Sequence, residues 1–389
     1  MMSVHKPVVF IINSLEGGGA ERVMCKLLSA MESYFKERNT PVYLLLLDDV
    51  PQAHECPAYV NKIVLNTKGT LFGGYLALRK LLKKLQPAIA LSFLTRSNLL
   101  NIVLGKQLGY RAIISERVNT SSHFPGGVKD EISKAMVRFV YPRADTIIAV
   151  SEGVKADLVQ NYGVPSSIVE TVYNPYDIEH VVALSQEPVS DCPSGSYIIG
   201  TGRLVKNKNF ALMIKAFAAS SLEDDLVILG QGEEQSSLEA LAASLGVEQR
   251  VHFMGFKANP YPYIRQARFF VSTSNAEGFP NAIVEAMCLS KAVVATNCES
   301  GPAEILSEKY PLEVSGSQAH KHGCLCEVNN VDGVAAAMDF LNDDIRCEQY
   351  AYKSSARARD FSTAIFRQKI IGVLEKDSHS EGMAYVRAG

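Results

Sequence analysis

Short apolar runs recur along this chain, and longer amphipathic segments separate them. Each run is rich in Val, Ile and Leu and lacks the apolar–polar alternation of a strand with one face in solvent. The ten runs cover residues 8–12, 42–47, 88–93, 112–115, 146–150, 197–201, 226–229, 251–254, 269–272 and 292–296. Strands of this kind are buried on both faces, so the pattern predicts an α/β protein whose parallel sheets are covered by helices on both sides.

A polar segment divides these strands into two sets of five. Residues 183–196 contain two prolines and four serines and show little apolar periodicity, which is typical of a linker. We therefore expect two doubly wound, Rossmann-like domains, one over residues 1–182 and one over residues 197–363. Residues 364–376 are predicted to form a last helix.

Charge, cysteine content and hydropathy exclude several classes of protein. The 39 Lys and Arg residues and the 41 Asp and Glu residues leave a net charge of −2, so no overall positive field would hold nucleic acid. The eight cysteines include no Cys-x-x-Cys pair, which suits a reducing compartment. No secretory signal is recognisable, and no run reaches 18 apolar residues, so we expect a cytoplasmic protein without a membrane-spanning helix.

Three consecutive glycines, Gly17, Gly18 and Gly19, stand between the first predicted strand and a helix that should begin near Ala20. Glycines let backbone N–H groups approach a ligand closely, and the N-terminal end of a helix attracts negative charge. The dinucleotide-binding pattern G-x-G-x-x-G is absent, because Arg22 occupies its last position. The glycines therefore indicate either an anion-binding turn or a simple tight turn between strand and helix.

A basic loop follows the first strand of the second predicted domain. After Gly202, Arg203 supplies a planar guanidinium with paired donors, and Lys208 supplies a compact ammonium five residues later. Ligands of doubly wound sheets bind at the carboxyl ends of the strands, so both cations could converge on one anion. The alternative is that both side chains are solvated, and this segment alone does not decide between the two.

Residues 274–287, which read SNAEGFPNAIVEAM, form the most specific pattern in the chain. They follow a predicted strand, and a helix that starts near Asn281 would place Glu277 above its N-terminus and Glu285 about one turn inside it. Carboxylates at these places can bind sugar hydroxyls. The backbone amides at the helix start can bind phosphate, at Gly278, Phe279 and Asn281. The alternative is a helix-capping glutamate and a surface glutamate.

Together these motifs resemble the donor-binding half of the family 4 retaining glycosyltransferases, which have the GT-B fold. The resemblance rests on residues 202–209, on Glu277-Gly278-Phe279-Pro280 with Glu285, on residues 300–305, on residues 17–22 and on residues 174–177. It covers nearly the whole chain and implies two Rossmann-like domains that face a central cleft, with the C-terminal helix in residues 364–389 packed back onto the first domain. Closest in character are bacterial transferases that extend lipid-linked or lipopolysaccharide oligosaccharides.

The resemblance implies roles for the candidate residues. Arg203 and Lys208 would hold the donor diphosphate and stabilise its charge as it leaves. Glu277 would contact the transferred sugar, and Glu285 would bind the ribose hydroxyls. The other donor-binding candidates are Gly17, Gly18, Gly19, Gly202, Phe256, Gly278, Phe279, Pro280 and Asn281.

The acceptor side departs from the family pattern. Members of the family often carry a histidine in the first domain that touches the sugar or the acceptor, and the equivalent stretch here, residues 115–119, has none. Glu116 is the acceptor-side candidate in its place. The cluster of His and Cys at residues 320–326 has the wrong spacing for the common structural zinc sites, so no metal site is expected there.

The resemblance implies an enzyme that moves a hexose or N-acetylhexosamine from a UDP-sugar to a growing bacterial glycan, such as a lipid-linked, lipopolysaccharide or capsule precursor, with retention of configuration. No Asp-x-Asp motif is present, and Arg203 with Lys208 could replace a divalent ion, so no metal or other cofactor is expected. Two alternatives remain: a nucleotide-sugar epimerase or phosphorylase on the same fold, and a non-catalytic partner in a glycan assembly complex.

The predicted helix at residues 76–85 carries a basic face. Its leucines at positions 78, 81, 82 and 85 follow helical spacing, and the opposite face holds Arg79, Lys80, Lys83 and Lys84. Such a face is commonly just solvated. A transferase that uses lipid-linked acceptors must reach a bilayer, however, so the alternative is peripheral contact with the cytoplasmic face of the inner membrane.

Overall fold

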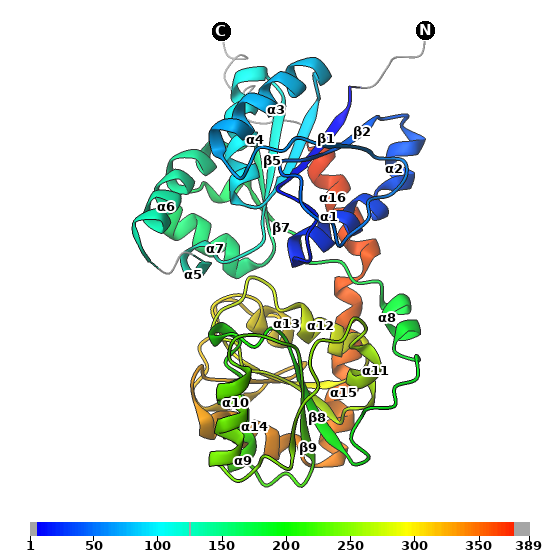
Figure 1. The fold of residues 1–389 in the computed structure, drawn as a ribbon, viewed down its shortest axis with the longest axis vertical. Helices are drawn as coiled ribbons and strands as arrows, with labels where there is room; N and C mark the ends of the chain where they lie inside the picture. The colour runs from blue at the N-terminus through cyan, green and yellow to red at the C-terminus, as the bar shows by residue number, and fades with distance from the viewer. Residues whose placement is uncertain (1–5, 124–125, 377–389) are drawn as a thin grey trace, which may run out of the picture. The chain divides into compact units, whose positions relative to one another are not determined.

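The computed structural model describes residues 6–123 and 126–376, and the chain divides into two compact units, each with its own sheet (Figure 1). The described part of the first unit comprises residues 6–123, 126–150, 154–175 and 363–376. The second unit comprises residues 151–153 and 176–362. Both units have the predicted doubly wound architecture, which confirms the expected α/β fold class.

The first unit contains a seven-stranded parallel sheet in the order β3-β2-β1-β4-β5-β6-β7. Its strands are β1 (Val8–Ile12), β2 (Val42–Leu46), β3 (Asn61–Val64), β4 (Ile89–Phe93), β5 (Arg111–Glu116), β6 (Thr146–Ala149) and β7 (Val169–Thr171). Its helices are α1 (Gly19–Ala30), α2 (Glu32–Glu37), α3 (Leu71–Leu85), α4 (Thr95–Leu108), α5 (Thr120–His123), α6 (Val128–Val140), α7 (Glu152–Tyr162, from residue 154 onward) and α16 (Thr363–Glu375).

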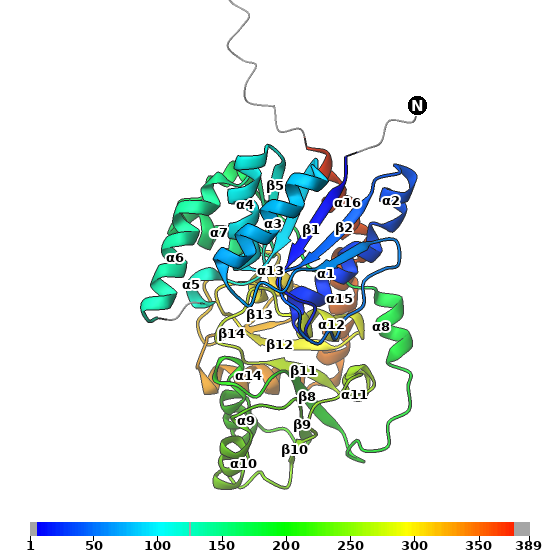
Figure 2. The ribbon, with the colours of Figure 1, turned by 45° about the horizontal axis from the view of Figure 1, so that its top comes forward.

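Helices cover both faces of this sheet (Figure 2). Alternate residues of β1 point to opposite faces, as strand geometry requires. Val8, Phe10 and Ile12 join one apolar core with α1, α2 and α16. Val9 and Ile11 join the other, with α3 and α4. This two-sided burial explains why the sequence of β1 is uniformly apolar.

The last helix, α16, packs on the first sheet after the chain has completed the second. It lies beside α1, red beside blue in Figures 1 and 2. Phe366 and Ile370 of α16 are buried in the same core as α1. Arg111 at the start of β5 donates hydrogen bonds to the carbonyl oxygens of Val373 (2.8 Å) and Leu374 (3.1 Å), which fixes the end of the helix.

The second unit also contains a seven-stranded sheet, in the order β10-β9-β8-β11-β12-β14-β13, in which β13 alone is antiparallel to its neighbour. Its strands are β8 (Tyr197–Thr201), β9 (Asp225–Leu229), β10 (Val251–Phe253), β11 (Phe269–Ser272), β12 (Ala292–Thr296), β13 (Ser317–Ala319) and β14 (Cys324–Cys326). Its helices are α8 (Ile178–Leu184), α9 (Phe210–Ala219), α10 (Gln235–Ser244), α11 (Tyr261–Gln266), α12 (Asn281–Cys288), α13 (Pro302–Ser307), α14 (Val331–Leu341) and α15 (Asp344–Ala358).

The chain passes from the first unit to the second at residue 176, upstream of the polar segment at 183–196. Helix α8 therefore belongs to the second unit, and so does the loop that follows it. Tyr176 is only 2% exposed, and its backbone N–H donates to the carbonyl of Phe361 at 2.9 Å. The polar composition of residues 183–196 therefore does not mark the boundary between the units. That boundary depends on the contacts each residue makes within a unit.

Candidate functional site

The second sheet reverses its strand order between β8 and β11, because β9 and β10 follow on one side and β12 on the other. In doubly wound sheets the loops beyond the carboxyl ends of two such strands diverge and leave room for a ligand. The loop after β8 holds the basic pattern of residues 202–209, and the loop after β11 leads into residues 274–287. The two most informative sequence motifs therefore meet at this switch point.

Hydrogen bonds join these two loops directly. The carbonyl of Asn207 accepts from the backbone N–H of Asn275 at 2.8 Å, and its side-chain amide donates to the carbonyl of Ala276 at 2.9 Å. The Thr273 hydroxyl donates to the carbonyl of Asn209 at 2.9 Å. These bonds fix the loops in register, so the side chains between them are held in place.

Lys208 and Glu277 form an ion pair across the two loops. The Ser274 hydroxyl donates to the same carboxylate oxygen of Glu277 at 2.7 Å. The side chains of Lys208 and Glu277 are 27% and 12% exposed, so the pair is partly shielded from water yet open to a ligand. The structure thus brings together two residues that the sequence motifs singled out separately.

Arg203 and Gly202 lie at the start of the same basic loop. The Arg203 side chain is exposed and forms no ion pair with any residue in the ranges that the structure describes. A side chain on Gly202 would lie 3.6 Å from the Lys208 stem, so Lys208 runs over this glycine. Arg203 therefore adds an exposed cation to the loop that carries Lys208.

Two further glycines, Gly230 and Gly232, were not identified from the sequence. A Cβ atom on Gly230 would lie 1.8 Å from the carbonyl oxygen of Gly202, and one on Gly232 would lie 2.3 Å from that of Leu204. Only glycine allows the loop after β9 to pack this closely against the basic loop. A G-x-G pattern directly after a buried strand was the available signal.

Phe256 lies near this group through its neighbour Gly255. The Gly255 carbonyl accepts from the backbone N–H of Gly230 at 2.8 Å, and Gly255 has a positive φ of 68°. The Phe256 side chain is 68% exposed, which is unusual for a large apolar residue. The backbone just before Phe256 therefore lies beside the glycine loop that follows β9.

Helix α12 begins at Asn281, as predicted, and carries Glu285 in its second turn. The Glu285 side chain is only 7% exposed. Phe279, just before the helix, is buried, and its ring packs edge-on against Phe361 with 5.6 Å between ring centroids. The Asn281 amide oxygen accepts from the Tyr176 hydroxyl. The side-chain contacts of Phe279 and Asn281 therefore hold the start of the helix in place.

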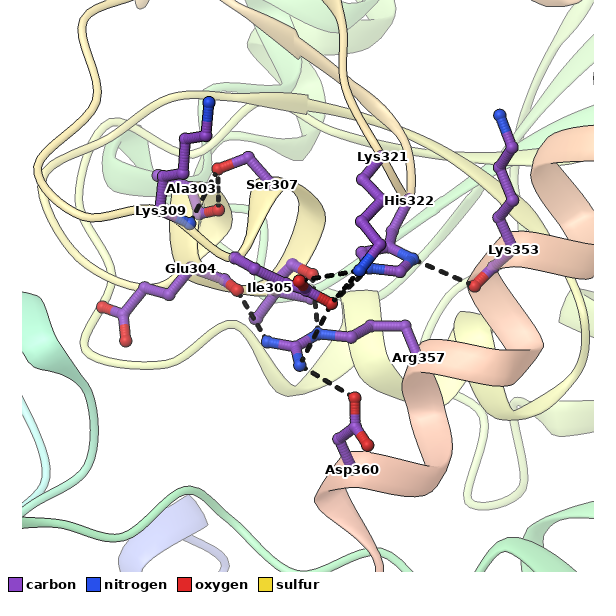
Figure 3. A network of polar contacts seen from close by, with 11 residues as sticks. Ala303, Glu304, Ile305, Ser307, Lys309, Lys321, His322, Lys353, Arg357 and Asp360 are labelled. Carbon is purple, nitrogen blue, oxygen red and sulfur yellow. Dashed lines mark hydrogen bonds and ion pairs between the residues drawn. The ribbon is translucent and has the colours of Figure 1, made fainter.

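The motif at residues 300–305 supports the helix tip from behind. Gly301 has a φ of 97°, and a Cβ atom there would lie 2.3 Å from the Pro280 ring. Arg357 of α15 donates to the carbonyls of Glu304 (2.8 Å) and Ile305 (3.2 Å), which holds helix α13 in place (Figure 3). Close packing against Pro280, just before α12, thus requires glycine at this position of the motif.

A second polar cluster stabilises the other end of α13 (Figure 3). The Glu308 carboxylate accepts from Lys321 (2.8 and 2.9 Å) and from His322 (2.8 Å). These hydrogen bonds, led by that of Lys321, lower the pKa of Glu308 to about 2. His322 also contacts the Lys353 carbonyl at 3.2 Å, so this histidine serves the packing of α13 against α15.

The glycine turn of the first unit follows β1. Helix α1 begins at Gly19, and a Cβ atom on Gly18 would lie 2.0 Å from a carboxylate oxygen of Glu21. Glu21 therefore folds back over the positive end of α1. Gly17 and Gly19 are exposed, so their backbone amides are accessible within this unit.

Glu116 ends β5 and lines a pocket of about 420 Å³ in the first unit. Its carboxylate accepts from the Tyr141 hydroxyl at 2.7 Å and from the backbone N–H of Arg117 at 3.1 Å. Burial raises the pKa of Glu116 to about 7, although the hydrogen bond from Tyr141 opposes the shift. A carboxyl group with this pKa can accept or donate a hydrogen bond near neutral pH.

An ion pair next to this pocket escaped the sequence analysis. Arg96, at the start of α4, pairs with Asp48, which follows β2. Both line a neighbouring pocket of about 360 Å³ together with Asn13 after β1. All three are polar residues within three positions of the end of a buried parallel strand, and that placement was the available signal.

We expect Glu116→Gln to change the pH dependence of stability. A buried acid whose folded pKa lies above its unfolded value near 4.5 keeps its proton longer in the folded state, so its contribution to stability falls as pH rises from about 4.5 to 7. Gln does not ionise, so the variant does not lose stability in this way. The free energy of unfolding of the variant minus that of the parent should therefore rise between pH 4.5 and 7. Urea denaturation at several pH values measures it, with exposed Glu37→Gln as control. A difference that does not change with pH would contradict the buried, protonated carboxyl.

Among residues 6–123 and 126–376, no group of three or more His, Cys, Asp or Glu side chains is placed to hold a metal ion. Within the same ranges, no helix combines the length and apolar character needed to cross a bilayer.

Two family models match the chain. Residues 17–180 match the model of Glycosyltransferase Family 4, and residues 193–357 match that of Glycosyl transferases group 1. The first match covers the first sheet from β2 onward, the second covers the whole second sheet, and the two include the candidate residues.

Curated relatives and solved structures agree with these models. The chain is 31% identical to the Campylobacter jejuni N-acetylgalactosamine-N,N'-diacetylbacillosaminyl-diphospho-undecaprenol 4-alpha-N-acetylgalactosaminyltransferase, over 90% of this chain and 94% of the relative. It is 28% identical to the lipopolysaccharide 1,6-galactosyltransferase of Salmonella typhimurium, over 42% of this chain and 46% of that protein. A crystal structure of Anabaena HepE in complex with UDP shares the fold with a TM-score of 0.73 at 18% identity, over 95% and 99% of the two chains.

Proposed function

Because this chain belongs to the family 4 glycosyltransferases and has the GT-B fold, we propose that it transfers a sugar from a UDP-sugar to a growing bacterial glycan, with retention of configuration. The acceptor we propose is a lipid-linked or lipopolysaccharide precursor, as the names of the relatives suggest for those proteins. One observation carries the proposal: Lys208 and Glu277 meet at the switch point of the second sheet, next to the tip of the helix that holds Glu285.

We assign the second unit to the donor. Breaking the bond between the sugar and the diphosphate leaves negative charge on the diphosphate, and preorganised cations lower the energy of that state. Arg203 and Lys208 are the cations of this site, and they would take the role that a divalent ion has in other transferases. Glu277 would contact the transferred hexose or N-acetylhexosamine, and Glu285 would accept from the ribose hydroxyls.

We assign the first unit to the acceptor. Its pocket of about 420 Å³ falls in the size range of small-molecule sites, and Glu116 can hydrogen-bond a sugar hydroxyl there. The exposed amides of Gly17 and Gly19 would add donors for the substrates. Apart from the glycine turn at residues 17–19, no sequence motif indicates an acceptor site in this unit.

Binding of nucleotides tests the donor assignment first. Isothermal titration should show binding of UDP, and a thermal-shift screen of nucleotide sugars should identify the donor. That donor should then release UDP in the presence of a polyprenyl-diphosphate-linked sugar, at a rate that EDTA leaves unchanged. If no nucleoside diphosphate binds, the proposed function is wrong. If EDTA abolishes turnover, the proposed function stands and only the metal-independent mechanism is wrong.

We also propose that the basic face of α3 contacts an anionic membrane surface at the cytoplasmic side. Arg79, Lys80, Lys83 and Lys84 are exposed and line a groove with Leu76, which is 51% exposed. Lysine and arginine near an anionic leaflet contribute about 1 kcal/mol each.

Charge reversal tests this contact. The triple variant Lys80→Glu, Lys83→Glu, Lys84→Glu should sediment poorly with liposomes that contain phosphatidylglycerol, whereas the parent should sediment with them. Lys215→Glu, an exposed change on α9 of the second unit, is the control for altered charge. Equal sedimentation of the triple variant and the parent would refute the contact.

A further inference from the structure

Helix α6 presents an apolar ridge to solvent. Val128, Ile132 and Phe139 are 79%, 54% and 66% exposed, although all three are large apolar side chains. Ile132 and Phe139 follow Val128 by four and eleven residues, which is about one and about three turns of helix, so they form one stripe. Ala135 is exposed on the same stripe. We call these four side chains the α6 ridge.

The α6 ridge points away from the core of the first unit. Val137 is 0% exposed and lies about two and a half turns after Val128, on the opposite side of the helix. A helix on a globular unit normally turns its apolar side inward, so α6 has an additional apolar side that the described residues leave in solvent. Single exposed apolar residues are common, but a continuous stripe of them indicates a surface that binds a partner.

Helix α6 shares a face of the first sheet with the basic helix α3. Right-handed crossovers that run in one direction along a parallel sheet lie on the same face, and the chain runs in one direction from β3 through β4 and β5 to β6. Helices α3, α4 and α6 therefore cover one face, and Figure 1 shows α6 on the side of the unit away from α1 and α16. Helix α4 contacts both α3 and α6, so their outward surfaces lie on one side of the unit.

The charge on this side of the unit identifies the chemistry of the partner. Helix α3 carries the four cations of residues 79–84 and no acidic residue, and its Phe72 is 73% exposed. On α6, three cations and two acids leave one positive charge, and one of the acids, Glu131, pairs with Lys134 at 3.0 Å. Exposed apolar side chains beside lysine and arginine are typical of helices that lie in the surface of an anionic bilayer.

A second copy of the chain fits the α6 ridge less well. The helix has 13 residues and is therefore about 20 Å long, so a contact one helix wide covers about 200 Å². A stable protein interface buries about 800 Å² on each partner. A bilayer needs no complementary shape and takes up a single apolar ridge along a helix.

We propose that α6 lies in the surface of an anionic phospholipid bilayer, with Val128, Ile132 and Phe139 inserted below the headgroups. The basic face of α3 attracts the anionic headgroups by charge, which salt screens. The inserted side chains of α6 add a contact that depends on apolar burial, which salt does not screen. This contact goes beyond the proposed transfer of sugar and can be measured without it.

Tryptophan fluorescence tests the insertion, because the chain contains no tryptophan and one introduced residue reports on its own position. Full-length Phe139→Trp is mixed with liposomes of phosphatidylglycerol and of phosphatidylcholine that carries bromine on its acyl chains. Its emission should shift to shorter wavelength and be quenched, since bromine quenches only at close range. Tyr352→Trp, at a side chain of α15 in the second unit that is 77% exposed, should show neither effect. Equal quenching of both variants would overturn the assignment to α6.

A matched pair of double variants measures the contribution of the α6 ridge. Ile132→Gln with Phe139→Gln should lower the affinity for the same liposomes by at least about 10-fold at about 0.5 M salt, where contacts between charges are screened. Ile345→Gln with Tyr352→Gln makes the same kind of change at exposed side chains of α15 and should leave the affinity unchanged. Thermal unfolding checks that both variants are folded. Equal affinity of the two double variants would overturn the proposal.

Further outcomes separate this contact from other partners and from the proposed function. Quenching of Phe139→Trp that requires a polyprenyl diphosphate in the liposomes would mean that the ridge binds an acceptor chain, and would overturn the proposal. A parent that dimerises in analytical ultracentrifugation, while the α6 double variant stays monomeric, would assign the ridge to a second copy and overturn it as well. Quenching without UDP binding or sugar transfer would support the membrane contact of α6 and overturn only the proposed function.

Discussion

Lys208→Ala is expected to lower kcat/KM by at least about 100-fold, which corresponds to about 2.7 kcal/mol of transition-state stabilisation. Lys208 bonds Glu277 across two loops that backbone and side-chain hydrogen bonds hold together. Its removal takes away a cation from the proposed diphosphate site and leaves a carboxylate that is 12% exposed without its partner. Both losses oppose the build-up of negative charge on the leaving group.

The chain offers a matched control for this variant. Lys206 lies on the same short turn, is exposed, and forms no ion pair within the described ranges, so Lys206→Ala should retain the activity of the parent. Steady-state UDP release measures both variants, and thermal unfolding checks that each is folded. Parental kcat/KM in folded Lys208→Ala would remove this residue from the catalytic site.

Glu285→Ala is expected to have an effect of similar size, at least about 100-fold in kcat/KM, but through nucleotide binding. The side chain lies in the second turn of α12 and is nearly buried, where a carboxylate that accepts from two ribose hydroxyls contributes strongly because water competes little. The loss should therefore appear as weaker UDP binding.

Comparison of two ligands distinguishes this role from a structural one. In calorimetry, Glu285→Gln, which keeps the shape of the side chain, should lose most of its affinity for UDP and keep that for inorganic diphosphate, which has no ribose. Equal weakening for both ligands would mean that Glu285 supports the fold of the helix tip and does not contact the ribose.

Local sequence patterns predicted much of the second unit. The strands at Tyr197–Thr201, Phe269–Ser272 and Ala292–Thr296 have the predicted bounds, and α12 starts at the predicted residue Asn281. Each of these elements is largely buried. A few consecutive residues therefore show either its apolar run or the Gly and Pro residues at its boundary.

Edge strands lacked such a signal. The sequence did not predict β3, three of whose four residues are exposed, or β7, which has only three residues. Both lie at the edges of the first sheet, where half of the pairing partners are absent and side chains meet solvent. An edge strand forms because it pairs with the adjacent strand, and its own residues need not be apolar.

The residue types that donor binding needs can be recognised from the sequence. Glycine, basic and acidic residues just after a predicted strand indicate a ligand site before the fold is known. The pairing of Lys208 with Glu277, 69 positions apart, could not be predicted in this way, nor could the pocket that Leu71, Leu99 and Met136 line together with Glu116. Both depend on which strands become neighbours and on which glycines let loops touch. The packing of the whole unit determines which strands pair and which loops touch, because these contacts join residues that are far apart in the sequence.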